Sequence, residues 1–235
     1  MENVSNEVMK NKLCVSKVPI FNNLEHEEMV EIAKMSQHKK FEKKELIFRA
    51  DDPSSHLYIV HKGRVKIYSL AESGKEQLVR IMEPGDFMGE LAIFKEEPLT
   101  CFAETMEAAE ICMIPKKDVV KLLMVRPEVS LKILSELSTR LKDTEESLER
   151  FRSKDAEKRL ASYLVELGIK AHDPAINTLK ITLPMSKKDL ASYLGMTQET
   201  VSRRLASFQE RGWIMQEGQR KIIISELETL KEASI

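Results

Sequence analysis

The spacing of the apolar residues changes once along this chain of 235 residues, close to Pro115. Before that point, from about residue 41, apolar and polar side chains alternate with a period near two, and turn-forming residues recur between the runs. This pattern predicts short antiparallel strands, which indicate a barrel, sandwich or roll. A short helix over residues 24–35 precedes them. The expected strands span residues 45–50, 57–60, 64–70, 77–82, 102–107 and 110–114.

After Pro115 the apolar spacing becomes helical. Residues 118–125 are typical of one helix, and Pro127 is suited to the first turn of a second. In that second helix leucine returns every seven residues, with another row between the leucines, which is the seam of a coiled coil. We favour a dimerisation helix, and the alternative is a helix lying against the strand region. The expected dimer seam is Leu134, Leu137, Leu141, Thr144, Leu148 and Phe151.

A third region follows from residue 153. A helix over 155–167, closed by Gly168, precedes a loop at 171–177. The spacing Ser186-x-x-Asp189 is that of a capping box, and Gly195 allows a tight turn before a second helix that Thr197 caps. Apolar residues on both sides of Gly218 then predict a hairpin. Helix, glycine turn, helix and hairpin together predict a winged helix-turn-helix.

The second of these helices carries chemistry suited to reading DNA bases. Glu199, Ser202 and Arg203 lie at i, i+3 and i+4 and therefore project from one face. Arginine donates two hydrogen bonds to guanine O6 and N7, and glutamate accepts from cytosine N4. The alternative is a solvated charged face with no such role. The expected base-reading residues are Gln198, Glu199, Ser202 and Arg203, and the expected phosphate contacts are Lys187, Lys188, Thr197, Arg204, Arg220 and Lys221.

Charge composition excludes a polybasic protein but not a basic domain. The chain has 37 Lys+Arg against 38 Asp+Glu, a formal charge of −1. Residues 152–235 carry 14 basic and 11 acidic residues, and the remainder carries 23 and 27, so the neutral total averages an acidic part and a modestly basic one. Weak nonspecific DNA affinity is the expected consequence.

Several classes of protein lack their signatures in this sequence. The three cysteines are too few and too far apart for a disulfide scaffold or a zinc knuckle. We find no catalytic triad, phosphate-binding glycine loop or metal-ligand cluster, and so expect no enzyme and no metal site. The polar N-terminus and the lack of a long apolar run predict a cytoplasmic protein with no membrane partner.

Three segments resemble the CRP/FNR family of bacterial transcription regulators. Residues 197–205 (TQETVSRRL) are similar to its recognition helix in the FNR form, residues 84–91 (PGDFMGEL) to its roll signature, and residues 153–161 (SKDAEKRLA) to the start of its FNR-type DNA-binding domain. The resemblance covers nearly the whole chain and places it closest to the FNR-like, Flp-type branch.

The resemblance implies an α+β fold with three parts. Residues 1–116 would form a double-stranded β-helix sensor, a cupin-like jelly roll of the cyclic-nucleotide-binding type. Residues 117–152 would form the dimerisation helix and residues 153–235 the winged helix-turn-helix domain. The resemblance further implies a homodimer that binds double-stranded DNA at a palindrome with TGA-type half-sites, read by Glu199, Ser202 and Arg203. The loop at 171–177 lies where relatives contact RNA polymerase.

The resemblance also identifies an effector pocket and a departure from it. Gly89, Glu90, Leu91 and Thr100 match the family's cyclic-nucleotide site, but Leu99 stands where an arginine would hold the cyclic phosphate. Losing a charge-assisted phosphate contact costs orders of magnitude in affinity, so we do not expect a cyclic-AMP response. The alternative for Gly89 and Glu90 is a purely structural role.

Two cysteines resemble cluster ligands of FNR-type oxygen sensors. Cys14 and Cys112 match two of four such positions, so we do not expect a 4Fe–4S cluster. The remaining pair resembles FNR-like proteins in which two cysteines form a dithiol/disulfide switch. The first alternative is that these thiols are unreactive and that Cys101 is a buried strand residue. The second is an organic effector or haem in the roll, for which the available imidazoles are His38, His56 and His61.

Overall fold

A computed structural model describes residues 18, 21, 24–53, 55–95, 97–152, 155–171 and 179–234, with the backbone alone at 92, 93, 146–152 and 170. The chain forms two compact units, Met1–Arg140 and Leu141–Ile235. Their boundary lies inside the long helix α5 (Pro127–Arg152), so the first half of the expected dimerisation helix belongs to the first unit.

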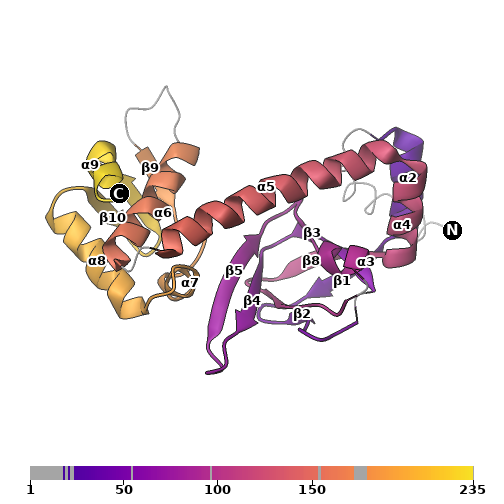
Figure 1. The fold of residues 1–235 in the computed structure, drawn as a ribbon, viewed down its shortest axis with the longest axis horizontal. Helices are drawn as coiled ribbons and strands as arrows, with labels where there is room; N and C mark the ends of the chain where they lie inside the picture. The colour runs from indigo at the N-terminus through magenta and orange to yellow at the C-terminus, as the bar shows by residue number, and fades with distance from the viewer. Residues whose placement is uncertain are drawn as a thin grey trace. The chain divides into compact units, whose positions relative to one another are not determined.

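The first unit contains two four-stranded antiparallel sheets wound into a roll (Figure 1). The first sheet has the order β1-β8-β3-β6 and the second sheet the order β2-β7-β4-β5. This confirms the predicted roll. The strands are β1 (Gln37–Phe41), β2 (Leu46–Phe48), β3 (His56–Lys62), β4 (Val65–Leu70), β5 (Glu76–Met82), β6 (Phe87–Met88), β7 (Phe102–Thr105) and β8 (Ala109–Pro115).

The central strands of the first sheet are buried on both faces. In β3, Tyr58 and Val60 pack between the two sheets, whereas Leu57 and Ile59 belong to a second apolar core on the outer face. Successive side chains of a strand point to opposite faces, so four consecutive apolar residues require a cover on each side. Helices supply the outer cover.

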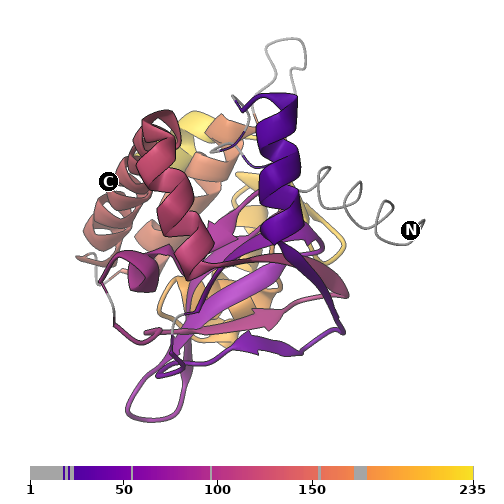
Figure 2. The same ribbon diagram turned by 90° about the vertical axis from the view of Figure 1, so that its right-hand side faces the viewer.

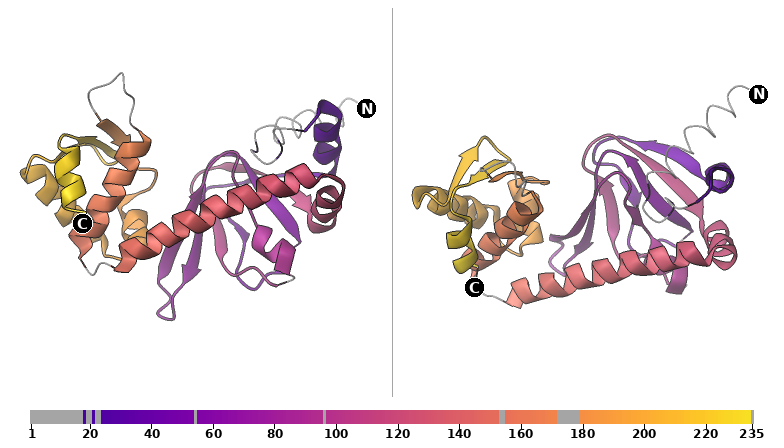
Figure 3. Two further views of the ribbon diagram at one scale, coloured as in Figure 1. Left: turned by 45° about the horizontal axis from the view of Figure 1, so that its top comes forward. Right: turned by 90° about the horizontal axis from the view of Figure 1, so that it is seen from above.

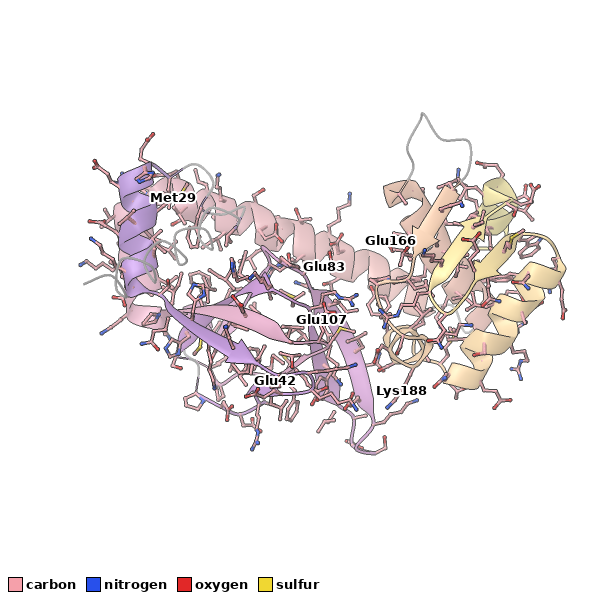
Figure 4. The ribbon with its side chains drawn as sticks, turned by 180° about the vertical axis from the view of Figure 1, so that it is seen from behind. Met29, Glu42, Glu83, Glu107, Glu166 and Lys188 are labelled. Atoms are coloured by element: carbon pink, nitrogen blue, oxygen red, sulfur yellow. The ribbon has the colours of Figure 1, made fainter. Side chains whose placement is uncertain are left out.

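Three helices cover the outer face of the first sheet (Figure 2): α2 (His26–Met35), α4 (Lys116–Val125) and the start of α5. Their buried contributions include Ile32 of α2, Val119 of α4, and Val129 and Ile133 of α5. Met29, labelled in Figure 4, packs from α2 against the same core. Helix α5 is therefore a structural part of the roll over its first turns.

A glycine is required where β6 leads into the short helix α3 (Glu90–Lys95). Gly89 has φ +88, and a Cβ there would lie 2.9 Å from the backbone oxygen of His56. Any other residue would combine left-handed backbone strain with a steric clash. This geometry supports a structural role for Gly89.

The second unit has a helical core and a three-stranded antiparallel sheet of order β10-β11-β9. Helix α9 packs on α6 (Figure 3). None of the described helices is long and apolar enough to span a membrane. The elements are α6 (Ala156–Lys170), β9 (Leu179–Thr182), α7 (Lys187–Tyr193), α8 (Gln198–Glu210), β10 (Ile214–Glu217), β11 (Lys221–Ile224) and α9 (Leu227–Glu232).

Local chemistry defines the α7–turn–α8 motif as predicted. Ser186 Oγ accepts a hydrogen bond from the backbone N–H of Asp189, and Thr197 Oγ1 accepts one from Thr200. Gly195 has φ +63 in the turn between the helices. Each cap satisfies a backbone donor that the first turn of a helix leaves without a partner. Both predicted caps and the turn glycine are confirmed.

The prediction that Gly168 ends α6 is wrong. The helix continues to Lys170, and Gly168 is buried, where a Cβ would lie 2.9 Å from Ile224 Cδ1 of β11. The glycine therefore permits close packing of α6 against the sheet. Its cost in helix propensity, about 1 kcal/mol, is offset by that contact.

We expect Leu205→Ala to lower the free energy of unfolding of the second unit by about 2–5 kcal/mol, because Leu205 is fully buried on α8 and truncation leaves a cavity. Trp213, the one tryptophan of the sequence, stacks on Phe208 of α8, so its fluorescence during urea denaturation reports on this unit. Glu210→Ala, at an exposed position of the same helix, is the control. Equal effects of the two changes would contradict the assigned packing.

Candidate nucleic-acid interface and roll cavity

Helix α8 presents an apolar face inward and a polar face outward. Val201, Leu205 and Phe208 are fully buried. Gln198, Glu199 and Arg203 are exposed and Ser202 is half-buried, so the four expected base-reading residues occur together at the accessible N-terminal part of one capped helix. An α-helix fits the major groove of B-DNA, and this arrangement would bring donors and acceptors to base edges.

Four of the six expected phosphate contacts are exposed. Lys188, labelled in Figure 4, lies in the first turn of α7, and Thr197 caps α8. Arg220 and Lys221 lie on the hairpin of β10 and β11, which turns at Gly218 with φ +72. Helix α7, the cap of α8 and the hairpin therefore each expose a cation or a hydroxyl group to solvent.

The other two expected phosphate contacts have partners inside the unit. Lys187 Nζ donates to Gln216 Oε1 of β10 at 2.9 Å. Arg204 Nη1 donates to Glu157 Oε2 of α6 at 2.7 Å. Each side chain would have to exchange this partner to bind a phosphate. Sequence reasoning missed Glu157, because no periodic pattern connects positions 47 residues apart.

The first unit contains a cavity of about 430 Å³, open to solvent on one side and lined by strands of the roll, α3 and Arg140 of α5. All five expected pocket residues, Gly89, Glu90, Leu91, Leu99 and Thr100, line it. Much of the remaining wall is apolar, with Phe48, Ile67, Met82, Phe87 and Met88. The structure thus brings the predicted pocket together as one cavity with mainly hydrophobic walls.

The Glu90 carboxylate binds a residue that sequence reasoning did not identify. Arg140 of α5 donates from Nη1 to Glu90 Oε1 at 2.8 Å and from Nη2 to the Phe87 carbonyl at 3.0 Å. Its guanidinium also lies 4.1 Å from the centre of the Phe87 ring. Both side chains are about 10% exposed. A buried carboxylate needs such a partner, and here α5 supplies it directly to the cavity wall.

Leu99 provides apolar packing where the family pattern has a cation. Its side chain is 5% exposed and joins the core between the sheets. Its backbone is held by Asp51 N–H, which donates to the Leu99 carbonyl at 2.8 Å, and its own N–H donates to Asp52 O at 3.0 Å. Besides Arg140, the cations among the described lining residues are Arg80 and Lys95.

The cysteines occupy different environments. Cys101 lines the cavity, where burial raises the pKa of its thiol and the nearby Glu90 carboxylate raises it further. Cys112 is fully buried on β8, in the outer core beneath the helices. Cys14, its expected partner, lies outside the described residues, as does most of the loop at 171–177.

The three histidines named as available to a haem lie away from the cavity lining. His38 and His61 contact each other edge to face, with ring centres 5.6 Å apart, and His56 lies at the start of β3. In the described part of the chain, no group of three or more His, Cys, Asp or Glu residues could hold a metal ion.

Helix α5 keeps an apolar face exposed after packing on the roll. Leu134 and Leu141 of the expected seam are 58% and 61% exposed, and Leu131 beside them is 67% exposed. Leu137 is half-buried and Thr144 is exposed, whereas the side chains of Leu148 and Phe151 lie outside those described. Large apolar side chains gathered along one helix are typical of an interaction surface.

A sensor-type roll followed by a winged helix-turn-helix with a polar recognition face defines the class of DNA-binding transcription regulators. Residues 38–126 match the cyclic nucleotide-binding domain family and residues 158–233 the Crp-like helix-turn-helix domain family.

Several known proteins match this chain over most of its length. The probable transcriptional regulator flp of Lacticaseibacillus casei is 32% identical over 212 residues, which cover 90% of this chain and 94% of flp. A CRP-like cAMP-activated global transcriptional regulator of Mycobacterium tuberculosis is 31% identical over 216 residues, 92% of this chain and 96% of that protein. A mutant of CooA from Carboxydothermus hydrogenoformans superimposes with a TM-score of 0.75 at 26% identity, covering 86% of this chain and 89% of CooA.

The chain belongs to the CRP/FNR family of transcriptional regulators, and the likeness to flp supports its FNR-like branch. The relatives are regulators rather than enzymes, in agreement with the sequence prediction.

We expect Arg140→Met to lower the stability of the roll by about 3–5 kcal/mol, because it leaves the Glu90 carboxylate buried without its guanidinium. The double variant Glu90→Gln/Arg140→Met removes both charges and should recover most of the loss. Hydrogen exchange of the β3 and β8 amides measures the effect. A double variant as unstable as Arg140→Met would contradict the proposed cause.

Proposed function

We propose that this chain is a homodimeric, sequence-specific transcription factor that binds a palindrome with TGA-type half-sites. The observation that carries the proposal is the exposed set Glu199, Ser202 and Arg203 on a capped helix whose opposite face is fully buried. Arg203 would donate to guanine O6 and N7, Glu199 would accept from the paired cytosine, and Ser202 would contact a neighbouring base. Gln198 borders the same set.

Phosphate contacts would fix the position of α8 in the groove. Lys188 of α7, Thr197 at the cap of α8, and Arg220 and Lys221 of the hairpin are exposed and are suited to that role. Lys187 and Arg204 join them only if they leave Gln216 and Glu157. Such contacts add affinity without sequence preference.

The exposed leucines of α5 support a homodimer. Val129 and Ile133 pack on the roll, and Leu131, Leu134 and Leu141 stay accessible on the same helix. A second copy of α5 would remove these side chains from water, since leucines at heptad spacing pack against each other in coiled coils. Two copies would also supply the two recognition helices that a palindrome requires. The family resemblance further implies that the DNA-bound dimer would contact RNA polymerase.

The signal would enter at the roll. The apolar cavity and Leu99 favour a small organic effector other than cyclic AMP, and none of the three available histidines lines the cavity for a haem. Because Arg140 belongs to α5, a ligand that contacts Glu90 or Arg140 would act directly on the helix that continues to the DNA-binding domain.

The second candidate input is a Cys14–Cys112 disulfide. It would join the N-terminal segment to β8, with two electrons and two protons passing to an oxidant. Cys112 lies beneath α2 and α4, so forming or breaking the bond would change how the helices cover the first sheet. A cytosolic disulfide of this kind is plausible only as a transient sensor.

We expect Arg203→Ala to cost about 1–3 kcal/mol on the palindrome and to reduce the preference over a scrambled duplex. Lys188→Ala should weaken both duplexes alike and reduce the salt slope of binding by about one. Fluorescence anisotropy at several salt concentrations measures both quantities. Equal loss of preference in the two variants would refute these roles, and no binding to any duplex under reduced, oxidised and ligand-screened conditions would favour a non-DNA ligand-binding module.

For the redox input, we expect DNA affinity of the wild type to differ between dithiothreitol and a mild oxidant, and this difference to vanish in Cys112→Ser. Cys101→Ser, at the cavity, is the matched control and should retain the difference. Identical binding by reduced and oxidised wild type would eliminate the disulfide switch and leave the organic effector.

A further inference from the structure

One carboxylate in the second unit binds two arginines of the recognition region. Glu157 Oε2 accepts from Arg204 Nη1 and Glu157 Oε1 accepts from Arg211 Nη1, each at 2.7 Å. The Glu157 side chain is 18% exposed, and those of Arg204 and Arg211 are 33% and 44% exposed. Both carboxylate oxygens are therefore used on cations at the edge of the domain, close to solvent.

The two arginines lie on one flank of the recognition helix. Arg204 follows the base-reading Arg203 directly, and Arg211 is the C-cap of α8, seven residues further on. Residues seven apart on a helix lie on the same side, next to the buried face that packs on α6. Arg203 is exposed and makes no side-chain hydrogen bond or ion pair with the described residues, whereas Arg204 is half-buried. The two neighbouring arginines of α8 therefore differ. Arg204 already binds a carboxylate of the protein, and Arg203 does not.

The bond between Glu157 and Arg204 satisfies the guanidinium only in part. Arg204 Nε is buried and makes no hydrogen bond within the described residues. Arg211 already uses the second oxygen of Glu157, so Arg204 gains hydrogen bonds by moving to a group whose two oxygens are both free to accept. Phosphate is such a group, and arginine binds carboxylate and phosphate through the same donors. Glu157 and a DNA phosphate therefore compete for these arginines.

This competition bears on specificity. Phosphate contacts supply essentially all nonspecific affinity, while base contacts supply the preference. Residues 152–235 have a surplus of only three basic residues, and without the Glu157 charge that surplus becomes four, with two guanidiniums released beside the base-reading face. A carboxylate that holds them reduces binding to every sequence and leaves Arg203 to discriminate.

We propose that Glu157 is a specificity-determining residue that takes the place of DNA phosphate for Arg204 and Arg211 and so limits nonspecific binding. The proposal rests on the proposed DNA-reading function. It assigns Arg204 a conditional role in phosphate binding, in place of the constant one expected from the sequence.

The experiment compares wild type and Glu157→Gln, as full-length protein, on a TGA palindrome and on a scrambled duplex of equal length. We expect Glu157→Gln to bind the scrambled duplex more tightly, with a salt slope steeper by about 0.9–1.8 for one or two additional phosphate contacts. Its advantage over wild type should shrink about 3- to 12-fold between 50 and 200 mM salt, which is that slope applied to a fourfold change in salt. The preference for the palindrome should fall.

Glu210→Gln is the charge-matched control. Glu210 is exposed on α8, and its loss changes the net charge equally without releasing either arginine. We expect it to leave the salt slope within 0.5 of wild type. An unchanged slope in Glu157→Gln, or an equal gain in Glu210→Gln, would overturn the proposal.

A double-mutant cycle that combines Glu157→Gln with Arg204→Gln/Arg211→Gln distinguishes competition with DNA phosphate from a merely structural contact. In the wild-type background these changes should leave the salt slope on the scrambled duplex nearly unchanged, because Glu157 already holds both arginines away from phosphate. In the Glu157→Gln background they should remove the gain. If Glu157→Gln only loosens the packing of α8 on α6, affinity for both duplexes falls with no steeper slope, which rejects the proposal. If wild type binds neither duplex, the proposed DNA-reading function fails instead.

Discussion

Burial of the first sheet on both faces is the constraint from which the rest of the first unit follows. Strand β3 has four consecutive buried apolar residues, Leu57 to Val60, so the second sheet must cover one face and helices the other. Val129 and Ile133 of α5 meet this demand at one end of that helix. The same demand places Arg140 where it reaches Glu90, so the helix that completes the outer core also forms part of the cavity wall.

The parts of the fold that depend on local chemistry could be predicted from the sequence. The caps at Ser186 and Thr197 and the turn at Gly195 each depend on a few adjacent residues, and the α7–turn–α8 motif is as expected. Strands β1, β6 and β9 were not predicted. Lys39 and Lys40 of β1 make it resemble a loop, and it is a strand because it pairs with β8 at the edge of the sheet. Pairing with a distant strand leaves no local signal.

The candidate sites also contain residues that could be predicted from the sequence and residues that could not. The exposed face of α8 follows from helical periodicity alone, whereas the five pocket residues were expected only from the resemblance to the CRP/FNR family. Arg140 and Glu157 could not be found, because each acts through an ion pair across 50 or 47 residues. Position 99 shows the converse. Its leucine is apparent in the sequence, but only the structure shows that its side chain fills core and that its backbone is paired with Asp51 and Asp52.

The exposed leucines of α5 have a consequence for how such a regulator responds to its own abundance. A chain that binds its operator only as a pair occupies that operator, at low concentration, in proportion to the square of the amount of protein. Halving the expression level would then reduce occupancy about fourfold. Leu131, Leu134 and Leu141 would thereby convert a gradual change in synthesis into a sharper change in transcription, before any ligand or oxidant acts.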